Sequence, residues 1–422
     1  MGLTMVANFK DVFAVILAGG QSSRLYPFNK VLSDLTGSGK SLIQQAYGRL
    51  SLVPRGQRYV LTTREMVAPI RRQLKLAADH FFVDPARRGT WPAMLWAMAH
   101  LRQGYGGQAH LRRKNADAVI AVMTGDHVIP KVKEFQKAFR QAVRAAAKEP
   151  VFVVIPVKPS DEPEEWVHFG SIKADEGIRR RTDPAQPIIG FEEKPSLERA
   201  GQMIEEGGWF WNAGMFFFRI SVAEAALQAC QPAMCRIYRR MSEAVSQHKV
   251  KLAAKIFEKF PEKISHPLDF QRFVDNTIDY AIMMPVVHQP NAAASAWVAR
   301  QALSDWADLG QWTALRQIVR PDRQRNTRIG RVRTVSTTDC ILVAGKGCSI
   351  QAEGLKNFVV AFSGKEALVL PEKDVPRIKE LARQARAAGR KIVVSGVPNG
   401  YVRIRGRSLI VSSTGVLYDK SR

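Results

Sequence analysis

The chain has 422 residues, and 63 Lys and Arg against 38 Asp and Glu give it a net charge of +25. This length predicts two or three domains, and a hydrophobic content of 46% excludes a disordered chain. No uninterrupted apolar run reaches the roughly 18 residues of a membrane span. Residues 1–20 also lack the basic start and cleavage site of a signal peptide, so we expect a cytoplasmic protein with no membrane partner.

Strand and helix patterns alternate through the first 150 residues. Apolar, β-rich runs predict strands at Val12–Ala18, Arg58–Leu61 and Ala118–Met123. Helical patterns lie between them at Leu42–Leu50, Met66–Ala78 and Pro92–Leu101. The alternation predicts an α/β fold, a mainly parallel sheet with helices on both faces. Ligands of such sheets bind beyond the carboxyl ends of the strands, where Gly19-Gly20 and Gly125-Asp126 follow two of them.

The pattern changes after about residue 322. Before that point, further strands are predicted at Val151–Val157, Pro187–Phe191 and Trp211–Ile220, and further helices at Leu197–Glu206 and within residues 222–259. Between about residues 326 and 369, short β-rich pieces recur with Gly, Asn, Asp and Ser between them, which indicates a small β domain; a few coils of a β-solenoid are one form of it. A helix is predicted near residues 374–389. We therefore divide the chain into domains of residues 1–322 and 323–422.

Two segments have no predicted function. Residues 104–114 read G-Y-G-G-Q-A-H-L-R-R-K and resemble an insertion, and we favour a mobile surface loop over a grip on phosphate or nucleic acid. The tail, residues 391–422, contains two or three strand-like pieces.

The excess charge admits three explanations: a nucleic-acid partner, an anionic small substrate, or a generally basic surface. Arg and Lys are scattered in short clusters rather than concentrated in one arm, which favours the basic surface. The four cysteines have neither the density of a disulfide framework nor the spacing of a zinc site.

The most informative segment is residues 17–27, L-A-G-G-Q-S-S-R-L-Y-P. A strand that runs into Gly19-Gly20 lets the backbone approach a nucleotide closely, with its amide groups directed at phosphates. Arg24 adds a fork of donors for phosphate oxygens, and Lys30 adds a compact cation. An ordinary tight turn is the alternative, and the glycine pair alone does not exclude it.

This segment resembles the signature of the sugar-nucleotide pyrophosphorylases. Six further segments match the family in chain order, and specifically its mannose-1-phosphate guanylyltransferase branch: D-P-A-R-R-G-T-W-P-A at 84–93, T-G-D-H-V-I at 124–129, G-F-E-E-K-P at 190–195, W-N-A-G-M-F at 211–216, T-I-D-Y-A at 277–281 and W-A-D-L-G-Q-W at 306–312. The resemblance covers about residues 11–385.

The resemblance implies a Rossmann-like nucleotidyltransferase domain that makes GDP-mannose and pyrophosphate from GTP and mannose 1-phosphate. The attack of a sugar phosphate on the α-phosphorus needs no protein nucleophile, but it needs neutralisation of phosphate charge, for which Mg²⁺ is suited. The implied catalytic residues are Arg24, Lys30, Asp126 and Asp308, with Asp126 and Asp308 as metal ligands rather than helix caps. The implied nucleotide contacts are Gly19, Gly20, Ser22, Arg88 and Thr90. The implied sugar-phosphate contacts are Gly170, Glu193, Lys194 and Asn212, and a homo-oligomer is a further expectation.

The sequence departs from the branch at several positions. Ser22 replaces a signature glycine, Gly89 stands where the branch has Asn, Trp91 where it has Ala, and Met284 where it has Glu. Two alternatives therefore stay open. One is a thymidylyl- or uridylyltransferase acting on another sugar 1-phosphate, and the other is a catalytically weakened member of the family that binds nucleic acid.

Overall fold

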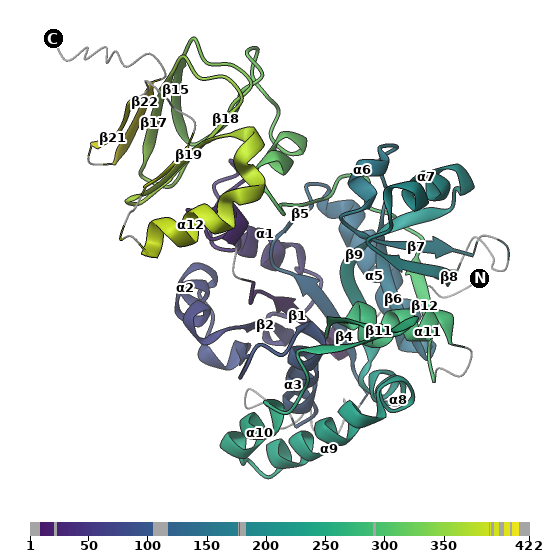
Figure 1. Cartoon of the computed structure of the whole chain (residues 1–422). Coiled ribbons are helices and arrows are strands. Elements are labelled where there is room, and N and C mark those ends of the chain that lie inside the picture. Colours follow the sequence, from purple (N-terminus) through teal and green to yellow (C-terminus); the bar gives the residue numbers. More distant parts are fainter. Residues whose placement is uncertain are drawn as a thin grey trace. The chain divides into compact units, whose positions relative to one another are not determined.

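A computed structural model of the chain describes residues 9–20, 23–103, 117–175, 177, 183–289, 293–387, 389, 392–395, 401–405 and 407–412 (Figure 1). The contacts divide it into two compact units. The first unit comprises Met1–Gly19, Ala46–Thr124 and Ile129–Trp306, and the second comprises Gly20–Gln45, Gly125–Val128 and Ala307–Arg422. The second unit is therefore assembled from three separate stretches of sequence, and residues 322 and 323 both belong to it.

The first unit is built on a nine-stranded sheet with the order β3-β2-β1-β4-β9-β6-β12-β8-β7. Its strands are β1 (Val12–Leu17), β2 (Arg58–Thr62), β3 (Phe81–Val83), β4 (Val119–Thr124), β6 (Val151–Val157), β7 (Gly170–Ala174), β8 (Ala185–Glu193), β9 (Trp209–Arg219) and β12 (Ser295–Ala299). Strands β8 and β9 run against the others. Strand β1 reads V-F-A-V-I-L and is buried on both faces, as expected for a covered parallel strand. The predicted α/β fold with a mainly parallel sheet is confirmed.

Helices of the first unit cover this sheet, and those within residues 90–102 and 220–288 contribute side chains to one large apolar core. They are α1 (Leu42–Arg49), which begins in the second unit, α2 (Arg64–Leu74), α3 (Thr90–Arg102), α5 (Val132–Lys148), α6 (Pro163–Trp166), α7 (Leu197–Glu206), α8 (Ile220–Cys230), α9 (Pro232–Ser246), α10 (Val250–Phe257) and α11 (Met284–His288). In α5, Phe135, Ala138, Phe139, Ala142 and Val143 are buried at the spacing of one helical face. Short 3₁₀ turns lie at η1 (Phe9–Asp11), η3 (Arg55–Gln57) and η4 (Ala78–His80).

Two features of the first unit were not expected from the sequence. An antiparallel hairpin, β10 (Lys263–His266) and β11 (Asp269–Asp275), follows α10. A single turn of π-helix, η5 (Asp279–Met283), then precedes α11. π-Helical turns are rare and are frequently found at functional sites.

The second unit contains a domain of two β-sheets. One has the order β14-β16-β18-β19-β20, and the other has the order β15-β17-β22-β21. Their strands are β14 (Thr327–Ile329), β15 (Arg331–Val335), β16 (Ile341–Ala344), β17 (Ser349–Glu353), β18 (Phe358–Ser363), β19 (Glu366–Pro371), β20 (Ile392–Val394), β21 (Tyr401–Arg405) and β22 (Ser408–Ser412). From β14 to β18 the chain alternates between the two sheets and pairs in parallel with its predecessor in each. This is the pattern of a short β-solenoid, so the β-rich C-terminal part is confirmed.

The remaining elements of the second unit lie around this β domain. They are η2 (Ser23–Leu25), β5 (His127–Val128), β13 (Ala307–Asp308), η6 (Trp312–Gln317), η7 (Glu372–Arg377) and α12 (Ile378–Ala387). The last two together occupy the place of the predicted helix near residues 374–389. Ser22 and the predicted insertion at residues 104–114 lie outside the described residues. Within the described part of the chain, no helix combines the length and the apolar character needed to cross a membrane.

Candidate active site

Three charged side chains of the second unit converge on one point. The Lys30 ammonium donates to Asp126 Oδ2 at 2.8 Å and also to Asp308 Oδ1. The two aspartates are held side by side because β5 and β13 pair antiparallel, with His127 opposite Asp308. Lys30 itself is buried, with 7% of its surface exposed, whereas the two carboxylates are each 35% exposed. The carboxylates therefore remain accessible from solvent while sharing one cation.

Arg24 lies close to this group. A Cβ on Gly310 would be 3.8 Å from Arg24 Nη1, which places the guanidinium beside the turn that follows Asp308. Arg24 is exposed on η2. Its guanidinium carries five donors that suit an anion.

Mutual attraction determines the charge state of the group. Burial lowers the pKa of Lys30, but Asp126 and Asp308 outweigh burial and hold that pKa above its ordinary value. Burial raises the pKa of Asp308, but the charges of His127, Lys30 and Arg24 outweigh it and hold that pKa below its ordinary value. Asp308 is consequently an anion and Lys30 a cation at neutral pH.

The two carboxylates fit a hard divalent cation. Asp126 and Asp308 already converge on one positive charge, and carboxylate oxygens are preferred ligands of Mg²⁺. The described residues contain no cluster of three or more His, Cys, Asp or Glu side chains that would enclose a metal ion. A site with two protein ligands suits Mg²⁺, which usually keeps several waters and binds substrate phosphates.

A second group of polar residues lies in the first unit, at the adjacent strands β7, β8 and β9. Gly170 pairs with Glu193 across β7 and β8, and a Cβ on Gly170 would overlap Glu193 Oε2. Lys194 Nζ lies 3.7 Å from Glu193 Oε1. Lys194 has a φ of 54°, in the left-handed region, and such strain is often found at functional sites.

Asn212 and Asp279 complete this second group. Asn212 Nδ2 donates to Asp279 Oδ1 at 2.8 Å, and Asn212 Oδ1 accepts from the Gly214 amide at 2.9 Å. These two bonds fix the orientation of the Asn212 amide. Asp279 is the first residue of η5, and the motif T-I-D-Y-A contains it, but our sequence reasoning gave it no role. A buried acid in a matched motif was the signal that could have identified it.

The two carboxyl groups of this second group resist ionisation. Burial, reinforced by the nearby Asp279, raises the pKa of Glu193 to about 8, although Lys194 opposes the shift. Burial also raises the pKa of Asp279 above its ordinary value, against hydrogen bonds from its surroundings that include Asn212. Near neutral pH the pair therefore retains a proton, and a carboxylic acid can donate a hydrogen bond where a carboxylate can only accept one.

The other predicted nucleotide contacts are divided between the units. Gly19 belongs to the first unit and Gly20 to the second, and both are exposed. Thr90 is exposed at the first position of α3. Arg88 forms an ion pair with Glu262 at 2.5 Å.

Gly89, which precedes α3, explains one departure from the family pattern. It has a φ of 108°, and a Cβ there would overlap the backbone carbonyl of Asn276. The amide of Trp91 donates to that same carbonyl at 3.3 Å. The close approach of these two segments therefore requires glycine at position 89.

Comparison with known proteins decides the family. A family model described as nucleotidyl transferase matches residues 13–325. The chain belongs to the nucleotidyl transferase family. This nucleotidyl transferase is therefore an enzyme, as its sequence motifs predict.

Relatives of the nucleotidyl transferase align over most of its length. It is 29% identical over 376 residues to mannose-1-phosphate guanylyltransferase RfbM of Salmonella typhimurium, an alignment that covers 87% of the chain and 71% of RfbM. It is 30% identical over 395 residues to the alginate biosynthesis protein AlgA of Pseudomonas aeruginosa, which covers 89% of the chain and 72% of AlgA. The predicted resemblance to mannose-1-phosphate guanylyltransferases is confirmed.

A solved structure agrees with the fold. The crystal structure of mannose-1-phosphate geranyltransferase from Thermus thermophilus matches with a TM-score of 0.70 and 23% identity. The match covers 89% of the nucleotidyl transferase and 99% of that chain, so the likeness includes the β-rich C-terminal part.

Proposed function

We propose that this nucleotidyl transferase makes GDP-mannose and pyrophosphate from GTP and mannose 1-phosphate, with Mg²⁺, in the cytoplasm. The observation that carries the proposal is the convergence of Asp126 and Asp308 on the Lys30 ammonium, beside Arg24. The group combines accessible carboxylates for a divalent cation with cations for phosphate oxygens. The choice of guanine and mannose rests on the similarity to RfbM.

The proposed reaction is an in-line displacement at phosphorus. An oxygen of the sugar phosphate forms a bond to the α-phosphorus of GTP, and the bond from that phosphorus to pyrophosphate breaks. Arg24 and Lys30 hold phosphate oxygens, and Asp126 and Asp308 would hold Mg²⁺. When bound, Mg²⁺ supplies neutralisation of phosphate charge. Gly19, Gly20, Ser22, Arg88 and Thr90 are proposed to contact the nucleotide.

The first unit is proposed to bind the sugar phosphate. Lys194 has its side chain 63% exposed, so its ammonium can meet the sugar's phosphate group. Glu193 exchanges hydrogen bonds with sugar hydroxyls, and its retained proton lets it act as donor or acceptor. Gly170 leaves space for the Glu193 carboxyl group, and Asn212 stands beside it in a fixed orientation.

Release of pyrophosphate tests the proposal directly. The purified protein is mixed with Mg²⁺, each of four nucleoside triphosphates, and mannose 1-phosphate or glucose 1-phosphate. We expect the fastest release with GTP and mannose 1-phosphate. Faster release with TTP or UTP and glucose 1-phosphate would transfer the proposal to the alternative substrates. Release with no pair, together with a nucleic-acid gel shift at physiological salt, would favour the weakened, nucleic-acid-binding alternative.

A matched pair of variants tests the metal assignment. Asp308→Asn removes a charge from the group, and we expect turnover to fall by at least about 100-fold. Asp305→Asn is the control, because Asp305 is an exposed carboxylate three residues away. Equal turnover in the two variants would contradict the assignment of Asp308.

A further inference from the structure

The segments that carry the proposed phosphate- and metal-binding residues contribute apolar side chains to the core of the C-terminal β domain. One buried apolar cluster of the second unit contains the neighbours of the charged residues in sequence: Leu25, Tyr26, Phe28, Val128, Leu309 and Trp312. The same cluster contains side chains of the β domain and its helices: Ile329, Ile341, Val343, Val359, Ala361, Leu368, Leu370, Val375, Ile378 and Ala382. We call this set the shared core.

Each charged residue is within a few positions of a shared-core residue. Arg24 precedes Leu25, Asp126 lies two residues before Val128, and Asp308 precedes Leu309. Helix α12 packs against η2, the turn that presents Arg24. The ring of Phe28, two residues before Lys30, packs edge-on against Trp312 at a centroid distance of 5.8 Å. The backbone at all four charged residues is therefore anchored by side chains buried in the shared core.

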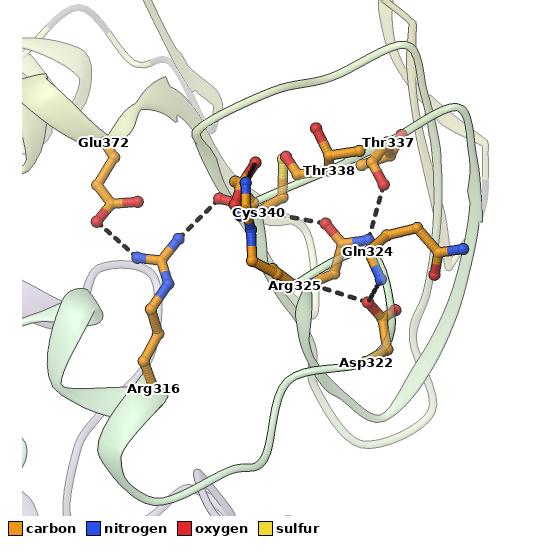
Figure 2. A network of polar contacts seen from close by, with 10 residues as sticks. Arg316, Asp322, Gln324, Arg325, Thr337, Thr338, Cys340 and Glu372 are labelled. Atoms are coloured by element: carbon orange, nitrogen blue, oxygen red, sulfur yellow. Dashed lines mark hydrogen bonds and ion pairs between the residues drawn. The ribbon is translucent and has the colours of Figure 1, made fainter.

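Polar contacts reinforce the connection on the Asp308 side (Figure 2). Arg316, on η6, donates to Glu372 at 2.5 Å and to the Asp339 carbonyl at 2.7 Å. Asn326 donates to the Thr337 carbonyl and accepts from the Cys340 amide. These bonds tie the chain that follows Asp308 to the turns of the solenoid.

We propose that the C-terminal β domain positions the phosphate- and metal-binding side chains, and that its shared core is part of the catalytic apparatus rather than an appended module. The inference rests on the proposed function for the roles of Arg24, Lys30, Asp126 and Asp308. Residues of the shared core touch no substrate. They act by fixing the backbone from which the charged side chains extend.

A second buried cluster in the β domain provides a matched control for substitutions in the shared core. This cluster, which includes Leu342, Ile350, Val360, Val369 and Leu409, has no member from the segments around the charged residues. Ile378 of the shared core and Ile350 of this second cluster are each 1% exposed. Replacing either by alanine removes the same atoms from an equally buried position.

The test compares Ile378→Ala with Ile350→Ala in the full-length protein. Both variants should lose thermal stability. Mn²⁺ binding is measured by calorimetry without nucleotide. Only Ile378→Ala should weaken Mn²⁺ binding and raise the KM for GTP, each by about tenfold or more. The reason is that small displacements of charged groups greatly weaken the binding of their ligands. Ile350→Ala should stay within about twofold of the wild type in both measurements.

Equal effects of the two substitutions, or unchanged Mn²⁺ binding in Ile378→Ala, would overturn the inference. If Ile378→Ala does not fold, Ile378→Val and Ile350→Val repeat the comparison with smaller cavities, and the same difference is expected. Mn²⁺ binding does not depend on which base and sugar the enzyme uses. A wild type that binds Mn²⁺ but releases no pyrophosphate therefore refutes the proposed substrates and leaves the positioning test intact.

Discussion

Replacing Lys30 by methionine should destabilise the metal-free protein and make it more responsive to divalent cations. The substitution keeps an unbranched side chain of similar length in a buried position but removes the ammonium that Asp126 and Asp308 share. The two carboxylates then repel each other without a cation between them. A bound divalent cation would restore the balance of charge.

The size of the effect follows from the geometry. Both carboxylates contact one nitrogen, so their nearest oxygens are at most about 6 Å apart, and two unit charges at that separation repel by roughly 3 kcal/mol at an effective dielectric constant of 20. Because each carboxylate is 35% exposed, water screens part of this energy. We therefore expect a loss of about 1 to 2 kcal/mol, which lowers the melting temperature by about 2 to 8 °C in a unit of this size.

The dependence on pH gives the prediction a second signature. The pKa of Asp308 lies below its ordinary value in the folded protein, so its stabilisation is present above about pH 4 and is lost as the pH falls through the lowered pKa. The difference in melting temperature between the wild type and Lys30→Met should therefore persist at pH 7 and shrink in acid.

Thermal unfolding in metal-free buffer of low salt, followed by titration with MgCl₂, measures both effects. Lys40→Met is the control, since Lys40 is exposed and belongs to the same unit. We expect Mg²⁺ to raise the melting temperature of Lys30→Met more than that of the wild type or the control. Equal melting temperatures for the two variants, or an equal response to Mg²⁺, would refute the reasoning.

Three further predictions concern the first unit. Asp279→Asn should lower the pKa of Glu193. The wild type is expected to lose unfolding free energy as the pH rises from about 5 to 8, and this loss should be smaller in the variant. Urea unfolding at several pH values measures the slope of unfolding free energy against pH, and an unchanged slope would count against the coupling of Glu193 and Asp279. Gly89→Asn restores the family residue but should lower the free energy of unfolding by about 2 kcal/mol or more, because the new Cβ overlaps the Asn276 carbonyl. Denaturant unfolding measures this loss. An unchanged free energy of unfolding would show that the backbone around Asn276 can move to make room. Gly170→Ala should displace the Glu193 carboxyl group. We expect the KM for the sugar phosphate to rise by about tenfold, and the KM for GTP to rise less. An equal rise in both KM values would argue against a role of Gly170 and Glu193 in binding the sugar phosphate.

The regular elements of the first unit could be predicted where the sequence pattern was strong. Strand β1 was predicted to within one residue because Val, Phe and Ile dominate its apolar run and Gly19-Gly20 follow shortly after it. Strand β12 was missed, because Ser295–Ala299 is a short, Ala-containing stretch whose role comes from pairing with β6 and β8. The hairpin β10–β11 was missed because almost every residue of β11 is exposed and no apolar alternation marks it.

The chemistry of the candidate site was only partly readable. Motifs identified Asp126, Asp308 and Lys30 as charged residues of interest, but their convergence depends on the pairing of two-residue strands that no local pattern predicts. The raised pKa of Glu193 depends on burial beside Asp279, a property of the folded chain alone. The sequence also offered no sign that residues near positions 25 and 378 share one core.

That shared core has a consequence for how the protein comes into being. Leu25 leaves the ribosome about 350 residues before Ile378, and at roughly 5 to 20 residues per second this interval lasts about 20 to 70 s. Throughout that time the signature segment has been made but lacks the side chains that bury it. A nascent chain can complete the nine-stranded sheet of the first unit earlier, since its last strand ends at Ala299. If the β domain positions the charged residues as we propose, we expect them to reach their working arrangement only after this domain has emerged, and we expect chains that stop short of it to be inactive.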